Sequence, residues 1–124
     1  MRSDGVKEDW AKAYFLIRMD LDLSPGKIAV QVGHGCDLIW QNRQSDEVAF
    51  ADWISRSDRR KILLKVDTGE KLKNIHERLT NANQVCYPIV DCGFTELDGP
   101  TETGLVVFPT NNPDKAIRRL RLYA

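Results

Sequence analysis

Apolar residues along this chain fall into two kinds of pattern, and each kind predicts a different element of secondary structure. Short runs that are nearly all apolar and rich in β-branched and aromatic side chains indicate buried strands. Stretches in which apolar residues recur every three or four positions indicate helices with one packed face. On this basis we predict four strands, at residues 13–19, 61–66, 85–90 and 105–108. We predict four helices, at residues 25–44, 46–55, 70–79 and 113–120.

The order of these elements, β-α-α-β-α-β-β-α, is typical of an α/β fold. We expect a single-domain, three-layer α/β/α sandwich around a small mixed, mostly parallel, four-stranded sheet. Residues 1–12 form a polar N-terminal extension, and the folded domain is expected at residues 13–124. Pro88 cannot donate to a strand ladder, so the third strand should be an edge strand or locally irregular. Ligands of such sheets bind where strands end, and the loops after the first and third strands are expected at one rim.

The first helix carries an unusual polar face. Ser24 is a good N-cap and Pro25 suits the first helical position. Lys27, Gln31 and His34 are spaced so that all three lie within about 60° of one another. A separate apolar stripe, about 130° further round the helix, should form its packed face; its members are Ile28, Val32, Cys36 and Ile39. Lys27 opposes the helix dipole in the first turn, and a bound anion such as phosphate would remove that conflict.

Composition narrows the function classes. The 124 residues carry 18 basic and 18 acidic side chains, so the formal net charge is zero. Phosphate contacts with nucleic acid would therefore have to come from local clusters, at residues 56–61 or 118–121, which could equally be solvated ends of elements. The three cysteines lack the spacing of a disulfide framework, which favours a reducing compartment, by default the cytosol. No apolar run approaches a membrane span, and residues 1–9 lack a hydrophobic signal core.

Three blocks of sequence resemble the type 2 peptidyl-tRNA hydrolases of archaea and eukaryotes. The first joins IRMDL at residues 17–21 to GKIAVQVGH at 26–34. The second is RKILLKV at 60–66, and the third is DCGFTE at 91–96, continuing to Pro109. The resemblance implies a small α/β fold that hydrolyses the ester joining a peptide to the 3′-terminal ribose of tRNA. It also implies no metal or cofactor and, frequently, a homodimer.

Carried onto matching positions, the resemblance implicates Lys27, Gln31, His34, Asp91 and Thr95 in catalysis. Ester hydrolysis needs an oriented water and donors for the developing oxyanion. Our hypothesis is that His34, helped by Asp91, positions or deprotonates the water. Lys27, Gln31 and Thr95 would then donate to phosphate, carbonyl or ribose oxygens.

Several alternatives stay open at this point. Asp91 could merely cap its loop, Thr95 could be a turn residue, and Cys92 could be a nucleophile, although it is better explained as a small packing residue. A zinc site is disfavoured because the cysteines and histidines lack zinc spacing. The chain could instead be a non-catalytic binding module, or a hydrolase of another acyl ester or amide.

Three departures from the family pattern bear on activity. Gly35 stands where alanine is usual, which should weaken the helix slightly. Phe94 occupies a position that is often small or basic, and could offer a stacking surface to RNA. Gly99 and Pro100 reverse the usual order, which should change the turn.

Overall fold

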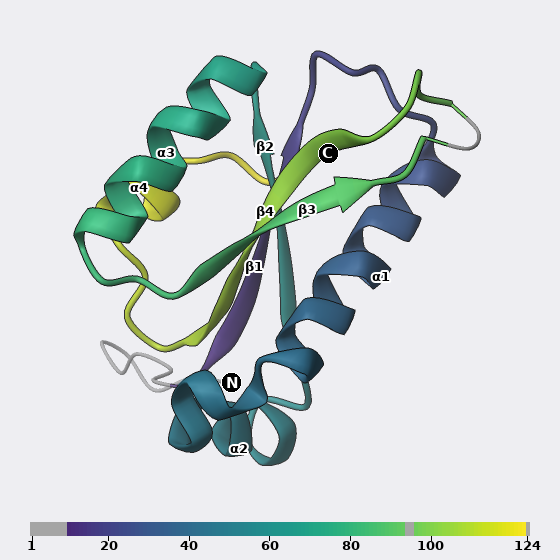
Figure 1. Ribbon diagram of the computed structural model, residues 1–124. Coiled ribbons are helices and arrows are strands. Elements are labelled where there is room, and N and C mark those ends of the chain that lie inside the picture. The colour runs from purple at the N-terminus through teal and green to yellow at the C-terminus, as the bar shows by residue number, and fades with distance from the viewer. Residues whose placement is uncertain (1–9, 94–95, 124) are drawn as a thin grey trace.

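The computed structural model describes residues 10–93 and 96–123. It contains one four-stranded sheet, four α-helices and a short 3₁₀ helix, η1 (Figure 1). The strands are β1 (Lys12–Arg18), β2 (Lys61–Val66), β3 (Cys86–Asp91) and β4 (Thr101–Thr110). The helices are α1 (Pro25–Gln41), η1 (Arg43–Asp46), α2 (Glu47–Ser55), α3 (Gly69–Asn81) and α4 (Lys115–Arg118). Residues 1–9 of the predicted N-terminal extension lie outside the described residues.

The sheet is mixed, as expected, but it is not mostly parallel. Its strand order is β2-β1-β4-β3, and only β1 and β2 pair in parallel. Both β1 with β4 and β3 with β4 are antiparallel. The expectation of mostly parallel pairing is therefore wrong, because β4 enters between β1 and β3 in the opposite direction. Pro88 does lie on an edge strand, and the register of that strand shifts between Ile89 and Val90.

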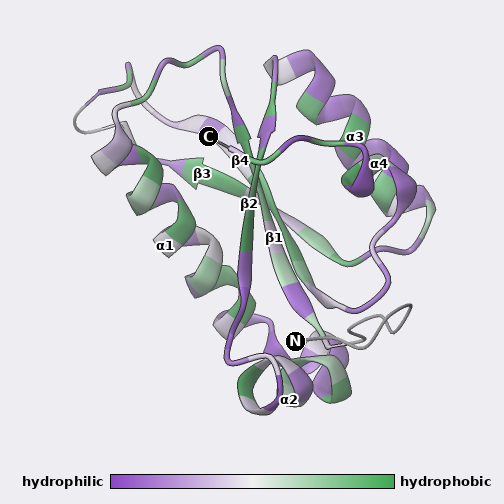
Figure 2. Cartoon of the chain, turned by 180° about the vertical axis from the view of Figure 1, so that it is seen from behind, coloured by the Kyte–Doolittle hydropathy of each residue, from purple (hydrophilic) through white to green (hydrophobic). Residues whose placement is uncertain are grey.

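Two separate hydrophobic cores make the three predicted layers. Side chains of successive strand residues point to opposite faces of a sheet, so Phe15 and Ile17 face α1 whereas Leu16 faces α3. Trp53 of α2 and Ile39 of α1 complete the first core. The second core is closed by residues of α3 and α4, namely Leu72, Ile75, Leu79 and Ile117. Figure 2 shows α1 and α3 on opposite sides of the apolar strands.

One rim of the sheet collects the ends of three strands. β1 and β2 run in the same direction, and β3 runs with them because both β1 and β3 are antiparallel to β4. Arg18, Val66 and Asp91, the last residues of these strands, therefore lie along one edge. The loop that leads from β1 into α1 lies at the same edge as the end of β3, as expected from the sequence.

The packed face of α1 differs from the predicted apolar stripe. Its buried residues are Gln31, Gly35 and Ile39, which follow one another at every fourth position. This line runs between the polar face and the predicted stripe, so the two faces are not separate. Gly35 explains the close approach of helix and sheet, because a methyl group at this position would lie 2.7 Å from the Phe15 ring. The helix buries the Gln31 amide by packing this closely.

Smaller differences affect the ends of elements. β4 begins at Thr101 rather than at residue 105, since Thr103 and Gly104 continue the pairing with β1 and β3 despite lacking large apolar side chains. The helix after β4 is shorter than predicted and ends at Arg118. Within residues 10–93 and 96–123, no helix combines the length and apolar character needed to cross a membrane.

Candidate active site

Three side chains of α1 converge on one carboxylate oxygen at the end of β3. The Oδ2 atom of Asp91 lies 2.8 Å from Gln31 Nε2 and 3.0 Å from Lys27 Nζ. His34 Nε2 lies 3.5 Å from the same oxygen, which is longer than an ordinary hydrogen bond. The second oxygen, Oδ1, accepts the backbone N–H of Gly93 at 2.8 Å. Four of the five residues implicated by the resemblance are thus brought together.

Asp91 is buried yet held in its ionised form. Only 3% of the residue is exposed, and burial alone would raise the pKa of its carboxyl group. Hydrogen bonds from Gln31, the Gly93 N–H and Lys27, together with the charge of Lys27, outweigh that effect and hold the pKa well below its ordinary value. The carboxylate is therefore a weak base at neutral pH and suits electrostatic support rather than proton transfer.

The Gln31 amide is fixed on both sides. Its oxygen accepts the Thr103 hydroxyl at 2.7 Å, so its nitrogen must face the Asp91 carboxylate, which can only accept. Both Gln31 and Thr103 are completely buried. Thr103 was not among the predicted site residues; the available signal was a polar residue in the third sequence block, directly before the apolar run of the last strand.

Asp91 resolves the unfavourable position of Lys27. The first turn of α1 contains no acidic residue, so no side chain of that turn offsets the ammonium group. In the structure, the anion beside Lys27 is a carboxylate of the protein itself: Asp91 Oδ2, at the end of β3, lies 3.0 Å from Lys27 Nζ. Lys27 is mostly buried, with 11% of its side chain exposed. One of its three N–H donors is directed at Asp91, and two remain for other acceptors.

A second acid, which sequence reasoning did not single out, closes the N-terminus of α1. The carboxylate of Glu96 accepts the Ser24 backbone N–H at 2.9 Å and the Ser24 hydroxyl in a short contact. The Ser24 hydroxyl in turn accepts the N–H of Lys27 at 3.2 Å, as an N-cap should. These hydrogen bonds from Ser24 hold the pKa of Glu96 below its ordinary value. Glu96 thereby ties the loop after β3 to the helix that carries Lys27.

His34 is the accessible member of the cluster. Its side chain is 42% exposed, whereas that of Asp91 is 4% exposed. An imidazole that faces solvent on one side and a buried carboxylate on the other can exchange protons with a bound water or substrate. The arrangement therefore places an imidazole at the surface and a buried carboxylate beneath it.

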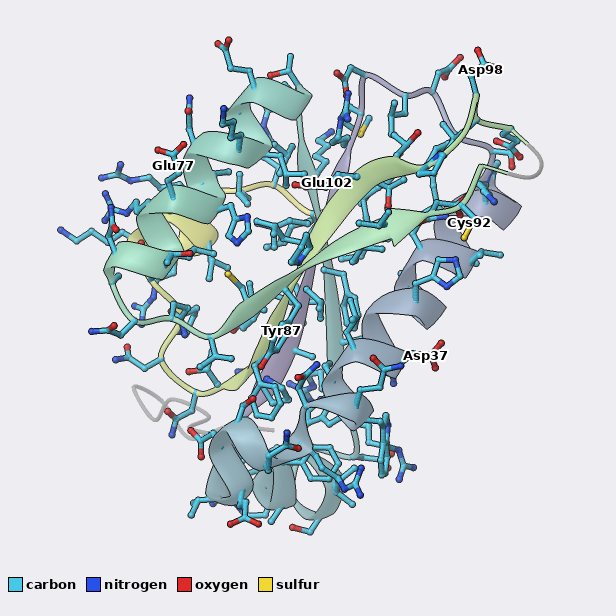
Figure 3. The ribbon with its side chains drawn as sticks, viewed as in Figure 1. Asp37, Glu77, Tyr87, Cys92, Asp98 and Glu102 are labelled. Carbon is cyan, nitrogen blue, oxygen red and sulfur yellow. The ribbon has the colours of Figure 1, made fainter. Side chains whose placement is uncertain are left out.

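Other sequence expectations around the site have mixed outcomes. Thr95 and Phe94 lie outside the described residues, so their predicted roles stay predictions. Cys92 is exposed, and Figure 3 shows it where β3 ends beside α1. The interpretation of Cys92 as a packing residue is therefore wrong, because its side chain turns away from the sheet when Asp91 turns inward. Among the described residues, no group of three or more histidine, cysteine or acidic side chains could hold a metal ion.

A buried carboxylate beside an exposed imidazole is an arrangement that can activate water, which is the chemistry that hydrolases use. The model of the family "Peptidyl-tRNA hydrolase PTH2" matches residues 11–123. The chain belongs to this family.

Similar proteins carry the same description. A peptidyl-tRNA hydrolase of Pyrobaculum aerophilum is 32% identical over 117 residues, which is 90% of this chain and 97% of the relative. One of Methanopyrus kandleri is 31% identical over 98 residues, covering 79% of this chain and 84% of the relative. One of Methanocaldococcus jannaschii is 27% identical over 114 residues, covering 90% and 98%. The likeness therefore extends over nearly the whole length of these archaeal proteins.

Proposed function

We propose that this protein hydrolyses the ester between peptide and tRNA in peptidyl-tRNA, with His34 as the general base. Membership of the PTH2 family supports the substrate and the reaction. The observation that carries the role of His34 is its exposed imidazole, 3.5 Å from the buried Asp91 carboxylate. We also propose a cytosolic location, which three free cysteines support. The homodimer implied by the resemblance stays a prediction.

The orientation of His34 suggests which nitrogen accepts the proton. Nε2 faces Asp91 Oδ2, and a carboxylate can only accept, so the neutral ring carries its proton on Nε2. Nδ1 is then free to accept a proton from water. Asp91 stabilises the imidazolium that forms, in the manner of the acid in a catalytic triad. Asp91 itself stays ionised throughout.

The proposed reaction follows from these positions. Water attacks the ester carbonyl carbon, its proton passes to Nδ1 of His34, and the carbonyl electron pair moves onto the oxygen. Lys27 donates to this oxyanion with an N–H that Asp91 does not use. When the tetrahedral species collapses, the bond to the ribose oxygen breaks and that oxygen takes the proton from His34.

Gln31 needs a different role from the one suggested by the sequence. It is fully buried, its amide nitrogen donates to Asp91 and to the Lys27 carbonyl, and its amide oxygen accepts from Thr103, so it has no free donor at the surface. We propose that Gln31 is a positioning residue that aims Asp91 at Lys27 and His34. Thr95 keeps its proposed role as a donor to substrate.

The experiment is a comparison of the two histidines of the chain. With purified protein and peptidyl-tRNA, His34→Ala should lower kcat by about 10²- to 10⁴-fold, the usual contribution of general acid–base catalysis. His76→Ala, on α3 and away from the site, should leave kcat within about twofold of the wild-type value. Equal rates for wild type and His34→Ala would reject the proposed base. Binding of tRNA without release of peptide by the wild type would instead support the binding-module alternative.

A further inference from the structure

The two basic clusters that the sequence predicts as candidates for nucleic-acid contact differ in whether their charges have partners within the protein. In the cluster at residues 56–61, Arg56 pairs with Asp52 and Arg59 lies 3.3 Å from Asp58. These charges are largely satisfied within the protein, and they precede β2 at the rim opposite the active site. The cluster at 56–61 therefore matches the solvated-end interpretation.

The C-terminal cluster behaves differently. Arg118 is held by the protein, since its Nε donates to the Pro113 carbonyl at 2.8 Å. Arg119 and Arg121 instead line a surface hollow of about 370 Å³, together with Lys65 of β2 and Lys71 of α3. We call Lys65, Lys71, Arg119 and Arg121 the basic hollow.

The basic hollow has almost no internal charge compensation. Its one acidic residue, Asp67, lies 3.8 Å from Lys71. Within the part of the chain that the structure describes, no acidic side chain pairs with Lys65, Arg119 or Arg121. Cations gathered without partners repel one another, and an anionic ligand would relieve that repulsion.

The backbone holds this arrangement in place. The segment after α4 runs antiparallel to β2, with a bridge between Leu64 and Leu122, and so lies along the outer edge of the sheet. The Lys65 N–H donates to the Arg121 carbonyl at 3.1 Å. The arginines are therefore carried by an ordered segment rather than by a free tail.

The position of the basic hollow relates it to the active site. Met19 and Asp67, which follow β1 and β2, line the hollow, so it opens at the rim where β3 delivers Asp91. β2 and β3 are the two outer strands of the sheet, which places them about 14 Å apart. A ligand bound in the hollow could thus extend along the rim to His34.

We propose that the basic hollow binds phosphates of the tRNA body while the ester lies at His34. The proposal rests on the proposed function, because it assigns the partner from the substrate of that site. A chain of zero net charge has no overall attraction for RNA, so phosphate binding depends on local unpaired cations such as these. The unpaired 3′ terminus of tRNA separates the ester from the duplex, so the phosphates of the tRNA body lie away from His34 when the ester is bound there.

The test compares two double variants: one removes two positive charges from the basic hollow, and the other, as a control, removes two positive charges near the opposite rim. Arg119→Gln with Arg121→Gln should raise the KM for peptidyl-tRNA about tenfold at physiological salt and leave kcat unchanged. The plot of log KM against log salt should become shallower by about 2. Arg43→Gln with Arg59→Gln makes the same change of net charge near the other rim and should alter KM less than about twofold.

Two further measurements separate docking from structural damage. A peptidyl ester of adenosine lacks the tRNA body, so the hollow variant should hydrolyse it as fast as the wild type. Asp67→Asn removes the acid of the hollow while Thr68 remains the N-cap of α3, and should lower the KM for peptidyl-tRNA about two- to threefold. Damage to the fold would instead slow hydrolysis of the adenosine ester by the hollow variant and would raise, not lower, the KM of Asp67→Asn.

The affinity of the protein for tRNA that carries no peptide distinguishes this docking proposal from the proposed function. Unchanged tRNA affinity in both the Arg119→Gln/Arg121→Gln variant and Lys65→Gln overturns the docking proposal, whatever the hydrolysis rates. Weakened binding in these variants supports docking even if the wild type releases no peptide, a result that would reject the proposed function alone.

Discussion

Two groups of charges lie at the same rim of the sheet, and they differ in almost every respect. In the cluster around Asp91, the side chains of Asp91 and Lys27 are largely buried, and each of these two charges has a partner from another element. The basic hollow is open, and three of its four cations have no acidic partner among the described residues. Buried charges must be paired to be tolerated, so they are held in fixed positions that suit chemistry. Exposed charges can stay unpaired and remain free for a partner.

This difference predicts that substitutions of buried, paired charges lower stability far more than substitutions of exposed charges, and the largest effect is expected at Asp91. Asp91→Ala leaves the Lys27 ammonium largely buried without a counter-charge, which should lower the free energy of unfolding by about 3–5 kcal/mol. Denaturation with urea at pH 7 measures this change. Asp98 is an exposed acid in the loop after β3 (Figure 3), and Asp98→Ala should lower the free energy of unfolding by less than about 0.5 kcal/mol.

A double variant and a change of pH sharpen the same prediction. Asp91→Ala combined with Lys27→Met should lower the free energy of unfolding by less than the sum of the two single substitutions, since the double variant leaves no ammonium group without a counter-charge. The pKa of Asp91 is lowered by folding, so its contribution is complete above about pH 4 and is lost as the pH falls further. The gap between wild type and Asp91→Ala should therefore narrow below about pH 4. A gap that widened there would contradict an ionised, paired Asp91.

The next largest effect is expected at Gln31 and tests positioning against substrate contact. Gln31→Leu removes the 2.8 Å donor to Asp91 and should cost about 1–3 kcal/mol of stability. The pKa of Asp91, followed by NMR of its carboxyl carbon, should rise toward the ordinary value. Activity should fall through kcat rather than through KM.

Thr103→Val is the matched control for Gln31. It removes a neutral hydrogen bond of 2.7 Å but leaves the amide beside Asp91, so kcat should fall less than in Gln31→Leu. If Gln31→Leu raised KM and left kcat unchanged, Gln31 would contact the substrate after all.

A smaller effect is expected from the glycines of α1, which test how closely the helix must approach the sheet. Gly35→Ala places a methyl group 2.7 Å from the buried Phe15 ring and should destabilise the protein by about 1–3 kcal/mol. Gly33→Ala meets no atom within 4 Å and should stabilise the same helix by about 0.5–1 kcal/mol. Thermal unfolding of the two variants measures both. A stabilised Gly35→Ala variant would show that the close approach is not required to bury Gln31.

Much of the fold could be predicted from local pattern. The apolar runs located all four strands, and Ser24 and Pro25 located the start of α1, because N-caps and buried strands depend on neighbouring residues. The ends of the elements differed more from the prediction. The sequence does not show that β4 continues through Thr101 to Gly104, since its pairing partners there come from distant strands.

The candidate site was predictable in its residues but not in its arrangement. The spacing of Lys27, Gln31 and His34 and the resemblance identified the side chains. Which of them would be buried depended on Gly35 and Phe15, which touch only after α1 docks on the sheet. Glu96 and Thr103 were not predicted as site residues, because their partners, Ser24 and Gln31, are 72 residues away in the chain.

The sequence by itself determined the elements, the polar face of α1 and the resemblance to a family of hydrolases. Only the tertiary structure decided the direction of β4, the burial of Gln31 and the pairing of Lys27 with Asp91. Only the tertiary structure, likewise, showed that the cations of residues 56–61 are largely satisfied while those of the basic hollow are not. The physical reason is that helix and strand preferences act over a few residues. Charge pairing, desolvation and strand order depend instead on which distant segments meet.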